Sequence, residues 1–346
     1  MSATTSIRRA ALMALAVTAG IAFGLAPPAA TDAPPAAPAY RVSGPHTHGN
    51  LTVFFLHGED AIKGKKLVTL DEALKAKQVI VHETRNVNEL SIENVSTETV
   101  FVQAGDIVKG GQQDRTIAVD LIVPPRSGRL PVSSFCVEQG RWAARGGENV
   151  RQFSSSSGAL VNNSLKLAAR GAKNQGEVWK EVQNAQQKLS MSVRGSVQSA
   201  QSQTSLQLTL EHKKLQDAIE ACVKKLEPTL GAKDADIIGY AVAINGKVSA
   251  ADVYANADLF RRLWPKLVRA SAIEAVGENK AGARVDAVKA EAVTAFLKDA
   301  HSGKRQERKI TDQLQEVQRE TSKNVLFETH LPAAKAAPIR RSYLAK

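Results

Sequence analysis

The stretch GDIVKGGQQDRTIAVDLIVPPRSGRLPVSSFCVEQGRW, residues 105–142, combines two β-type runs with charged, glycine-rich ends. The first run extends from Thr116 to Val123, and Pro124, Pro125 and Gly128 turn the chain into the second, Leu130–Val137. Apolar, β-branched runs bounded by Gly and Pro are typical of strands joined by turns. We therefore predict two adjacent strands whose polar ends, near residues 106–115 and 138–142, meet at one end or one face of a sheet.

Further short β runs precede this stretch. They cover 51–56, 78–84, 89–94 and 99–103, with one short helix at 70–77. The clean alternation of Glu89-Leu90-Ser91-Ile92-Glu93 is typical of a half-buried strand. Many short strands separated by turn residues indicate an antiparallel, β-sandwich-like region, here over residues 45–145.

The second half of the chain has a different pattern. Residues 146–176 are rich in Gly, Ser and Asn, which predicts a loop that either links two regions or closes over a site. The pattern of residues 177–330 predicts an α+β region. It begins with a helical hairpin (178–189 and 215–226) and a β-hairpin that turns at Asn245-Gly246. Helices at 257–277 and 288–298 and closing strands at 309–330 complete it. Pro265 predicts a kink or a new start in the helix at 257–277. The fold class expected is α+β.

The two ends of the chain have distinct compositions. Arg8 and Arg9 precede a run of about 16 apolar residues, which predicts a signal peptide over 1–30 and an exported protein, periplasmic or secreted. No later run approaches a membrane span. Residues 31–44 are a Pro/Ala linker, and residues 331–346 are expected to form a disordered basic tail.

The formal net charge is +12, and about +10 without Arg8 and Arg9. This surplus suits an anionic cell-envelope surface, although it also fits a simple solubilising role. No nucleic-acid-binding motif is present, so we expect no nucleic-acid partner.

Cys136 and Cys222 are the only cysteines. An oxidising compartment would permit a disulfide between them, and the alternative is two buried, reduced thiols. Known chemical motifs are absent. The spacing of Gly105 and Gly110 fits a phosphate-binding P-loop, but Gly111-Gln112 stands where Lys-Ser/Thr is required. His46, His48 and His57 could form a metal site, but His46 and His48 lie in a Pro/Gly turn without acidic or cysteine partners nearby, and we expect neither a metal nor a cofactor.

The candidate site therefore rests on the polar residues of the 105–142 stretch. Asp114 and Glu138 could act as acid and base, and Arg115 and Arg141 could clamp a carboxylate or phosphate. Trp142 could stack on a sugar or base ring. The remaining candidate ligand-binding residues are Asp106, Lys109 and Gln112. The alternative is structural: salt bridges at strand ends, glycines at bulges and an anchoring aromatic residue.

The same motifs, GDIVKGGQQDRT, VPP and LPVSSFCVEQGRW, with GYAVAINGKVSAADVY and LFRRLWPKLVRASAIEA further on, resemble the bacterial ARG and Rhodanese-Phosphatase-superfamily-associated protein domain family. The resemblance spans about residues 45–330 and implies one continuous unit but no established activity. The family name, through ADP-ribosylglycohydrolases, hints at ADP-ribose-like ligands.

Two functions remain open from the sequence. The first is a non-catalytic module that binds a small anionic molecule or a partner protein at the 105–142 surface. The second is a hydrolase of a phosphorylated, glycosylated or ADP-ribose-like small molecule. The absence of a recognised nucleophile, metal or cofactor motif favours the first.

Overall fold

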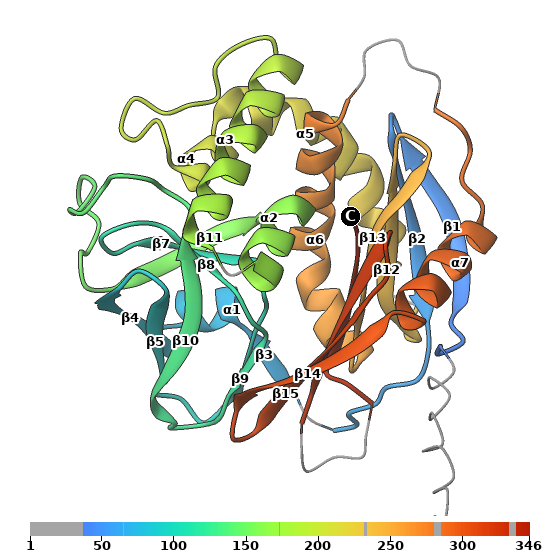
Figure 1. The fold of residues 1–346 in the computed structure, drawn as a ribbon, viewed down its shortest axis with the longest axis horizontal. Helices are drawn as coiled ribbons and strands as arrows, with labels where there is room; N and C mark the ends of the chain where they lie inside the picture. Colours follow the sequence, from blue (N-terminus) through green and yellow to red (C-terminus); the bar gives the residue numbers. More distant parts are fainter. Residues whose placement is uncertain (1–36, 65, 173, 232–233, 280–284, 332–336) are drawn as a thin grey trace, which may run out of the picture. The chain divides into compact units, whose positions relative to one another are not determined.

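Three β-sheets with helices packed on them form the protein in a computed structural model, which describes residues 37–346 except 65, 173, 232–233, 280–284 and 332–336 (Figure 1). The mixed α+β class with large antiparallel sheets is confirmed. The predicted signal peptide, and residues 31–36 of the predicted linker, lie outside the described residues.

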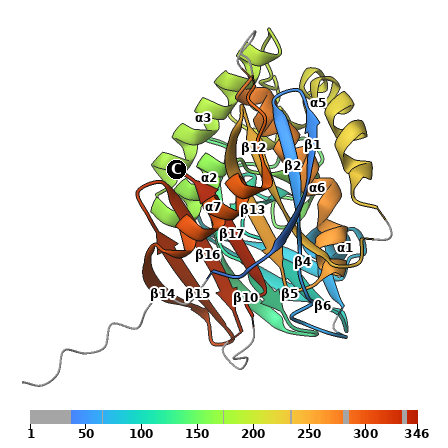
Figure 2. The ribbon, with the colours of Figure 1, turned by 90° about the vertical axis from the view of Figure 1, so that its right-hand side faces the viewer.

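The largest sheet joins the two ends of the described chain. Its eight strands, all antiparallel to their neighbours, are in order β1 (Arg41–His48), β2 (Leu51–His57), β12 (Ile237–Ile244), β13 (Lys247–Tyr254), β17 (Arg340–Ala345), β16 (Asn324–His330), β15 (Leu314–Glu320) and β14 (Lys304–Thr311) (Figure 2). The predicted turn between β12 and β13 is present, with φ of 51° at Asn245 and 79° at Gly246. Positive φ at both residues is what a type I′ turn requires.

Two predictions about the ends of the chain are corrected. The expected disordered basic tail, 331–346, contains strand β17, which lies between β13 and β16 with Arg340 fully buried. The expected linker, 31–44, contains the start of edge strand β1. Because β2 pairs with β12, the N-terminal strands and the C-terminal half share one sheet, and residues 36–346 form one compact unit.

The signature stretch belongs to a six-stranded sheet. Its order is β11 (Phe153–Leu160), β7 (Asp106–Gly110), β8 (Arg115–Ile117), β10 (Gly128–Cys136), β5 (Glu89–Asn94) and β4 (Val79–Asn86). The strands of a separate three-stranded sheet alternate in sequence with the strands of this one. They are β3 (Leu67–Thr69), β6 (Thr99–Val102) and β9 (Leu121–Val123). The expected loop at 146–176 is only partly a loop. It contains strand β11, helix α2 (Asn163–Leu167) and a π-helical turn, Ala168–Ala172.

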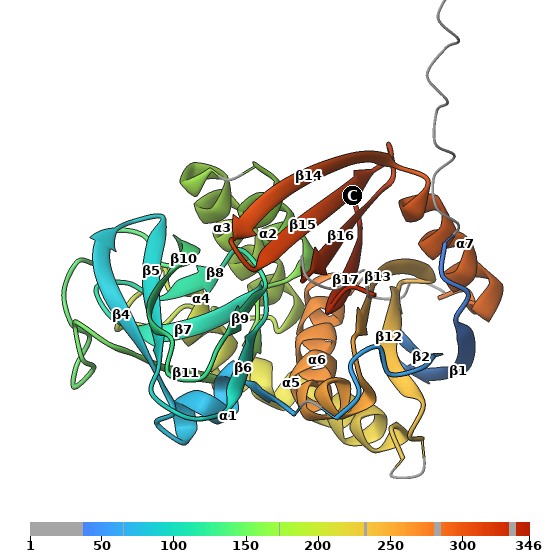
Figure 3. The same cartoon turned by 90° about the horizontal axis from the view of Figure 1, so that it is seen from below.

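Helix α6 (Ala257–Gly277) packs against both β12 and β11, and so lies between the two large sheets (Figure 3). Pro265 lies inside this helix without ending it. Helices α3 (Gln175–Ser192) and α5 (Lys213–Leu226), which the sequence predicts as a hairpin, both pack on α6. The remaining helices are α1 (Leu70–Lys75), α4 (Leu206–Leu210), α7 (Ala290–His301) and the 3-10 turn Glu227–Thr229.

The eight-stranded sheet is covered on both faces, which explains why every residue of β12 is buried. On one face, the aromatic stripe of α6 packs on the sheet, with the rings of Phe260 and Tyr240 stacked at 6.1 Å. On the other face, Phe296 and other apolar residues of α7 cover Phe54 and Tyr343. Burial of such large side chains is the main favourable contribution to folding.

A buried ionic network connects the two large sheets. Asp120, between β8 and β9, accepts hydrogen bonds from Arg340 of β17 at 2.7 Å, Arg170 at 3.1 Å and Thr329 of β16 at 2.7 Å. Burial by itself would raise the pKa of Asp120, but Arg340 and Arg170 hold it well below its usual range. The carboxylate therefore remains charged inside the protein.

His301, at the end of α7, gives a pH-dependent prediction. It is 5% exposed, lies 3.0 Å from the Tyr343 hydroxyl, and burial lowers its pKa to about 4. The unfolded chain takes up a proton near pH 6.5 whereas the folded protein does not, so this residue's contribution to stability is lost as the pH falls from about 6.5 to about 4.

Urea unfolding at pH 7 and pH 5 tests this. Between these values the wild type should lose about 1–2 kcal/mol more stability than His301→Gln, which has no group titrating at this position. Equal losses in the two proteins would mean that His301 does not resist protonation.

Candidate functional site

The glycines of the signature permit two strands to approach closely. Gly111 has a φ of +57°, and a Cβ on it would overlap the ring of Phe153 in β11. Its neighbour Gly110 pairs with Phe153 across the sheet. Only glycine combines this positive φ with the absence of a side chain, so these two residues position β11 beside β7.

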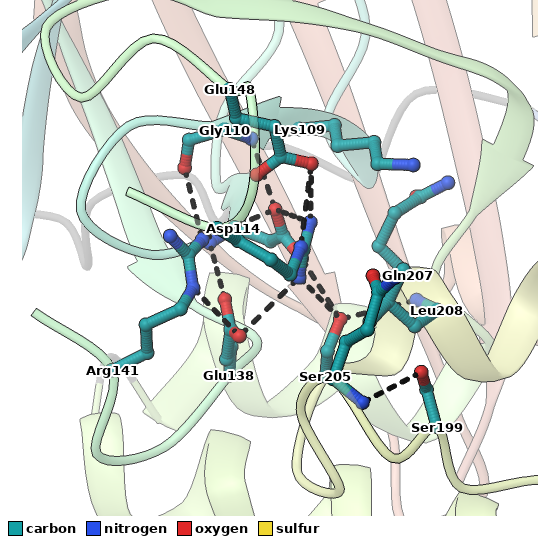
Figure 4. A network of polar contacts seen from close by, with 12 residues as sticks. Lys109, Gly110, Asp114, Glu138, Arg141, Glu148, Ser199, Ser205, Gln207 and Leu208 are labelled. Atoms are coloured by element: carbon teal, nitrogen blue, oxygen red, sulfur yellow. Dashed lines mark hydrogen bonds and ion pairs between the residues drawn. The ribbon is translucent and has the colours of Figure 1, made fainter. Parts of the chain in front are cut away.

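A buried cluster of charged residues forms where β7, β8 and β10 end (Figure 4). Asp114 accepts bonds from Arg145 at 2.9 and 3.0 Å, from the Ser205 hydroxyl at 2.9 Å and from the Gly110 N–H at 3.0 Å. Glu138 lies 2.8 Å from Arg141 Nε and 3.3 Å from Arg145. Asp114 and Glu138 are both fully buried. The predicted meeting of the two polar strand ends is present, because β8 pairs with β10.

Arg145 is the centre of this cluster. Burial by itself would lower the pKa of its guanidinium, but hydrogen bonds with Asp114 raise the pKa above its usual value. It also contacts Glu148 at 2.9 Å. Ser205 is the N-cap of α4, so its hydroxyl connects the cluster to that helix. The guanidinium groups of Arg141 and Arg145 are balanced by three carboxylates, those of Asp114, Glu138 and Glu148. The cluster therefore has no positive charge left to bind an anionic ligand.

Arg115 and Gln112 do not join the cluster. The Arg115 guanidinium faces the other way, toward Glu83 at 3.3 Å and the carbonyl oxygen of Val87 at 3.0 Å. Gln112 donates its backbone N–H to Glu83 at 3.3 Å. Neighbouring residues of an extended chain point to opposite faces, so Asp114 and Arg115 diverge. The predicted clamp of Arg115 with Arg141 is therefore not formed.

The other predicted ligand-binding residues are also separate. Asp106 is buried and contacts Lys266 of α6 at 2.6 Å. Lys109 pairs with Glu211 at 2.7 Å outside the cluster, but it lines the groove described below. Trp142 is exposed over half its area.

The two cysteines are free and buried, which corrects the suggested disulfide. Burial raises the pKa of Cys136 to about 11 and that of Cys222 to about 11. Because the thiolate is the nucleophile, neither residue is activated for covalent chemistry at neutral pH.

A groove opens directly above the cluster. It encloses about 1090 Å³, including open solvent, and Arg145 forms part of its floor. Its exposed polar side chains are the uncharged Asn149, Gln152, Ser154 and Gln201, and the partly exposed Lys109 and Glu148 add one charge of each sign. Gly146 and Gly147 add backbone groups, and Phe153, which is 7% exposed, adds a small aromatic patch. Such a lining provides hydrogen-bond donors and acceptors without a strong field of either sign.

Sequence reasoning missed Arg145, Ser205 and Gln201. A charged residue within the run Ala143-Ala144-Arg145-Gly146-Gly147 was a usable signal for the first. No local pattern distinguishes Ser205 or Gln201, because both lie in a Ser/Gln-rich segment up to 60 residues from Arg145 and reach the site only through the fold. Within the described ranges, no group of three or more His, Cys, Asp or Glu could hold a metal ion, and no helix is long and apolar enough to cross a membrane.

Comparison with known proteins identifies the family. The model of the ARG and Rhodanese-Phosphatase-superfamily-associated Protein domain matches residues 39–337, nearly the whole described chain. No curated protein and no solved structure matches the chain. The matched range includes the glycine pair, the buried cluster and the groove. The chain therefore belongs to the ARG and Rhodanese-Phosphatase-superfamily-associated protein domain family.

Proposed function

We propose that this protein is an exported, non-catalytic binding module, and that the groove above the Asp114–Arg145 cluster holds a polar, sugar-containing ligand of the cell envelope. The observation that carries the proposal is the lining of the groove: exposed amide and hydroxyl groups with a small aromatic patch over a charge-balanced floor. Sugars offer many hydroxyl groups and weakly polar ring faces, which such a lining complements.

Export is supported by the first 30 residues, where Arg8 and Arg9 precede an apolar run and a small, proline-rich segment. An exported protein meets cell-wall polymers and glycans directly. The exposed Trp142, on the loop that also carries Arg145, offers a further surface for stacking on a sugar ring.

The hydrolase alternative has less support. A general acid or base must come within hydrogen-bond reach of its substrate. Asp114 is fully buried and already accepts four hydrogen bonds, and Glu138 is held by Arg141 and Arg145. Neither carboxylate has a free face for a reacting atom.

A thermal-shift screen of the full chain against cell-wall fragments, neutral oligosaccharides, sugar phosphates, nucleotides and ADP-ribose tests the proposal. We expect a shift with sugar-containing ligands. For the best ligand, Gln152→Ala and Gln201→Ala should each weaken binding about threefold to tenfold, because each removes one hydrogen bond worth about 0.5–1.5 kcal/mol.

The matched control is Gln198→Ala, an exposed glutamine on the same segment that does not line the groove. It should leave the affinity within about twofold. Binding that is equally strong in all three variants would place the ligand elsewhere. Turnover of the ligand by the wild type would show that the protein is an enzyme and would overturn the proposal of a non-catalytic binding module.

A further inference from the structure

A small cavity lies deep in the protein, where β8 of the six-stranded sheet, β17 of the eight-stranded sheet and helix α2 come together (Figure 3). Every residue that lines it is buried, and it shares no lining residue with the groove. The centre of a water-sized group has about 10 Å³ in which to lie, which is room for one water molecule or one monatomic ion. Charge and hydrogen bonding therefore decide what occupies it.

The charged residues on the wall of the cavity are all cationic. They are Lys166 of α2, Arg170 of the π-helical turn and Arg340 of β17, and none of the lining residues is an Asp or a Glu. The two arginines are neutralised by carboxylates outside the wall. Arg340 donates to Asp120 at 2.7 Å and to Asp252 at 2.8 Å, and Arg170 donates to Asp120 at 3.1 Å.

Lys166 has no such partner. Its side chain is buried, with 9% of the residue exposed, and no carboxylate among the described residues forms an ion pair with it. Asp252 and Glu274 attract it from a distance, but Asp252 is already bound by Arg340. Its end lies at the cavity, because a Cβ on the lining residue Gly105 would come within 3.2 Å of Lys166 Cε. A buried charge without a close partner is unfavourable.

Thr116 provides a second unsatisfied group at the same place. It is fully buried in β8 and lines the cavity, and its hydroxyl has no hydrogen-bond partner among the described residues. Buried polar side chains are nearly always hydrogen-bonded, so such a group calls for a missing partner. A hydroxyl can donate its proton to an anion, as an ammonium group can.

We propose that this cavity binds one halide-sized anion, chloride in ordinary salt solutions, between the ammonium group of Lys166 and the hydroxyl of Thr116. Three cations and no carboxylate on the wall favour an anion over water. The small volume excludes sulfate, phosphate and carboxylates. The anion would connect β8 to α2 and complete the ionic network between the two large sheets.

Thermal unfolding of the full chain in sodium chloride tests the proposal, with sodium gluconate added to keep the ionic strength constant. Gluconate is too large for the cavity. An anion that binds only the folded protein raises the melting temperature. For each tenfold increase in chloride above its dissociation constant, the wild type should melt about 2 °C higher. Bromide should act like chloride.

Two substitutions remove the proposed ligands. Lys166→Met keeps an unbranched side chain without the charge, so its melting temperature should not depend on chloride. In gluconate this variant should be at least as stable as the wild type, because an unpaired buried charge has been removed. Thr116→Val keeps the shape but loses one hydrogen bond to the anion, and it should need about tenfold more chloride for the same shift.

The matched control is Lys180→Met, which removes an exposed lysine of α3 and should retain the full chloride dependence. The groove variant Gln152→Ala should retain it as well, so the two sites can fail independently.

Crystals of the full chain grown in sodium bromide locate the anion. We expect an anomalous peak in contact with Lys166 Nζ and Thr116 Oγ1, and no peak there in Lys166→Met. Two results would overturn the proposal. One is a chloride dependence that is equal in the wild type and Lys166→Met, and the other is a cavity that holds only water in bromide. Either result would mean that Lys166 is accommodated without an anion.

Discussion

Replacing Arg340 by methionine is expected to lower the free energy of unfolding by about 3–5 kcal/mol, which is a large fraction of the stability of an ordinary domain. Arg340 is fully buried in β17 and donates to Asp120 at 2.7 Å and to Asp252 at 2.8 Å. Methionine is close in length but carries no charge, so two buried carboxylates would lose their main counter-charge. The measurement is urea or guanidinium unfolding of the full chain at pH 7.

The matched control is Arg341→Met at the next position of the same strand. Arg341 pairs with Glu328 at 2.9 Å, and its side chain is 17% exposed. Glu328 keeps a second partner, Arg319 at 3.4 Å, so we expect a smaller loss of about 1–2 kcal/mol. Similar losses in the two variants would mean that the connection of the sheets through Asp120 adds nothing beyond an ordinary ion pair.

This network also shows why strand β17 could not be predicted from sequence. The segment Arg340-Arg341-Ser342-Tyr343 is basic and lies at the end of the chain, which favours a solvated tail. Its first residue is buried only because carboxylates 220 and 88 residues earlier in the chain reach it. Local composition contains no information about such distant partners.

Elements specified by nearby residues were predictable. The alternation of Glu89–Asn94 gave β5 with its correct bounds, and Asn245-Gly246 gave the β12–β13 turn. By contrast, β11 begins with Phe153 and four serines, a composition typical of loops. It is a strand because Gly110 and Gly111 of the neighbouring β7 segment leave room for it.

The candidate site was predicted in part for the same reason. The approach of Asp114 to Glu138 follows from local strand pairing, and the structure places Arg141 with them. The partners that complete the cluster come from outside the stretch. Arg145 returns from the following loop and Ser205 comes from the N-terminus of α4. Arg115 was misplaced because its neighbour Asp114 occupies the opposite face of the chain.

Asp114→Asn is the second substitution with a large expected effect, about 3–5 kcal/mol of stability. The Asp114 carboxylate accepts bonds from Arg145, Ser205 and the Gly110 N–H. An asparagine keeps the shape but turns one acceptor into a donor that faces the Arg145 guanidinium. Arg145 and Arg141 would then share only Glu138 and the partly exposed Glu148 as counter-charges.

The control is Asp217→Asn, which removes an exposed carboxylate paired with Lys213 on the surface of α5 and should change stability by less than about 1 kcal/mol. Hydrogen exchange gives a second readout, because loss of the Asp114–Ser205 bond should release the N-terminus of α4 and the loop at 145–149 in particular. If Asp114→Asn unfolds at the same urea concentration as the wild type but no longer binds the groove ligand, Asp114 acts on the ligand itself and the charged floor is not structural. If stability and binding fall together, and Asp217→Asn changes neither, the cluster is the support that holds the groove in its binding shape.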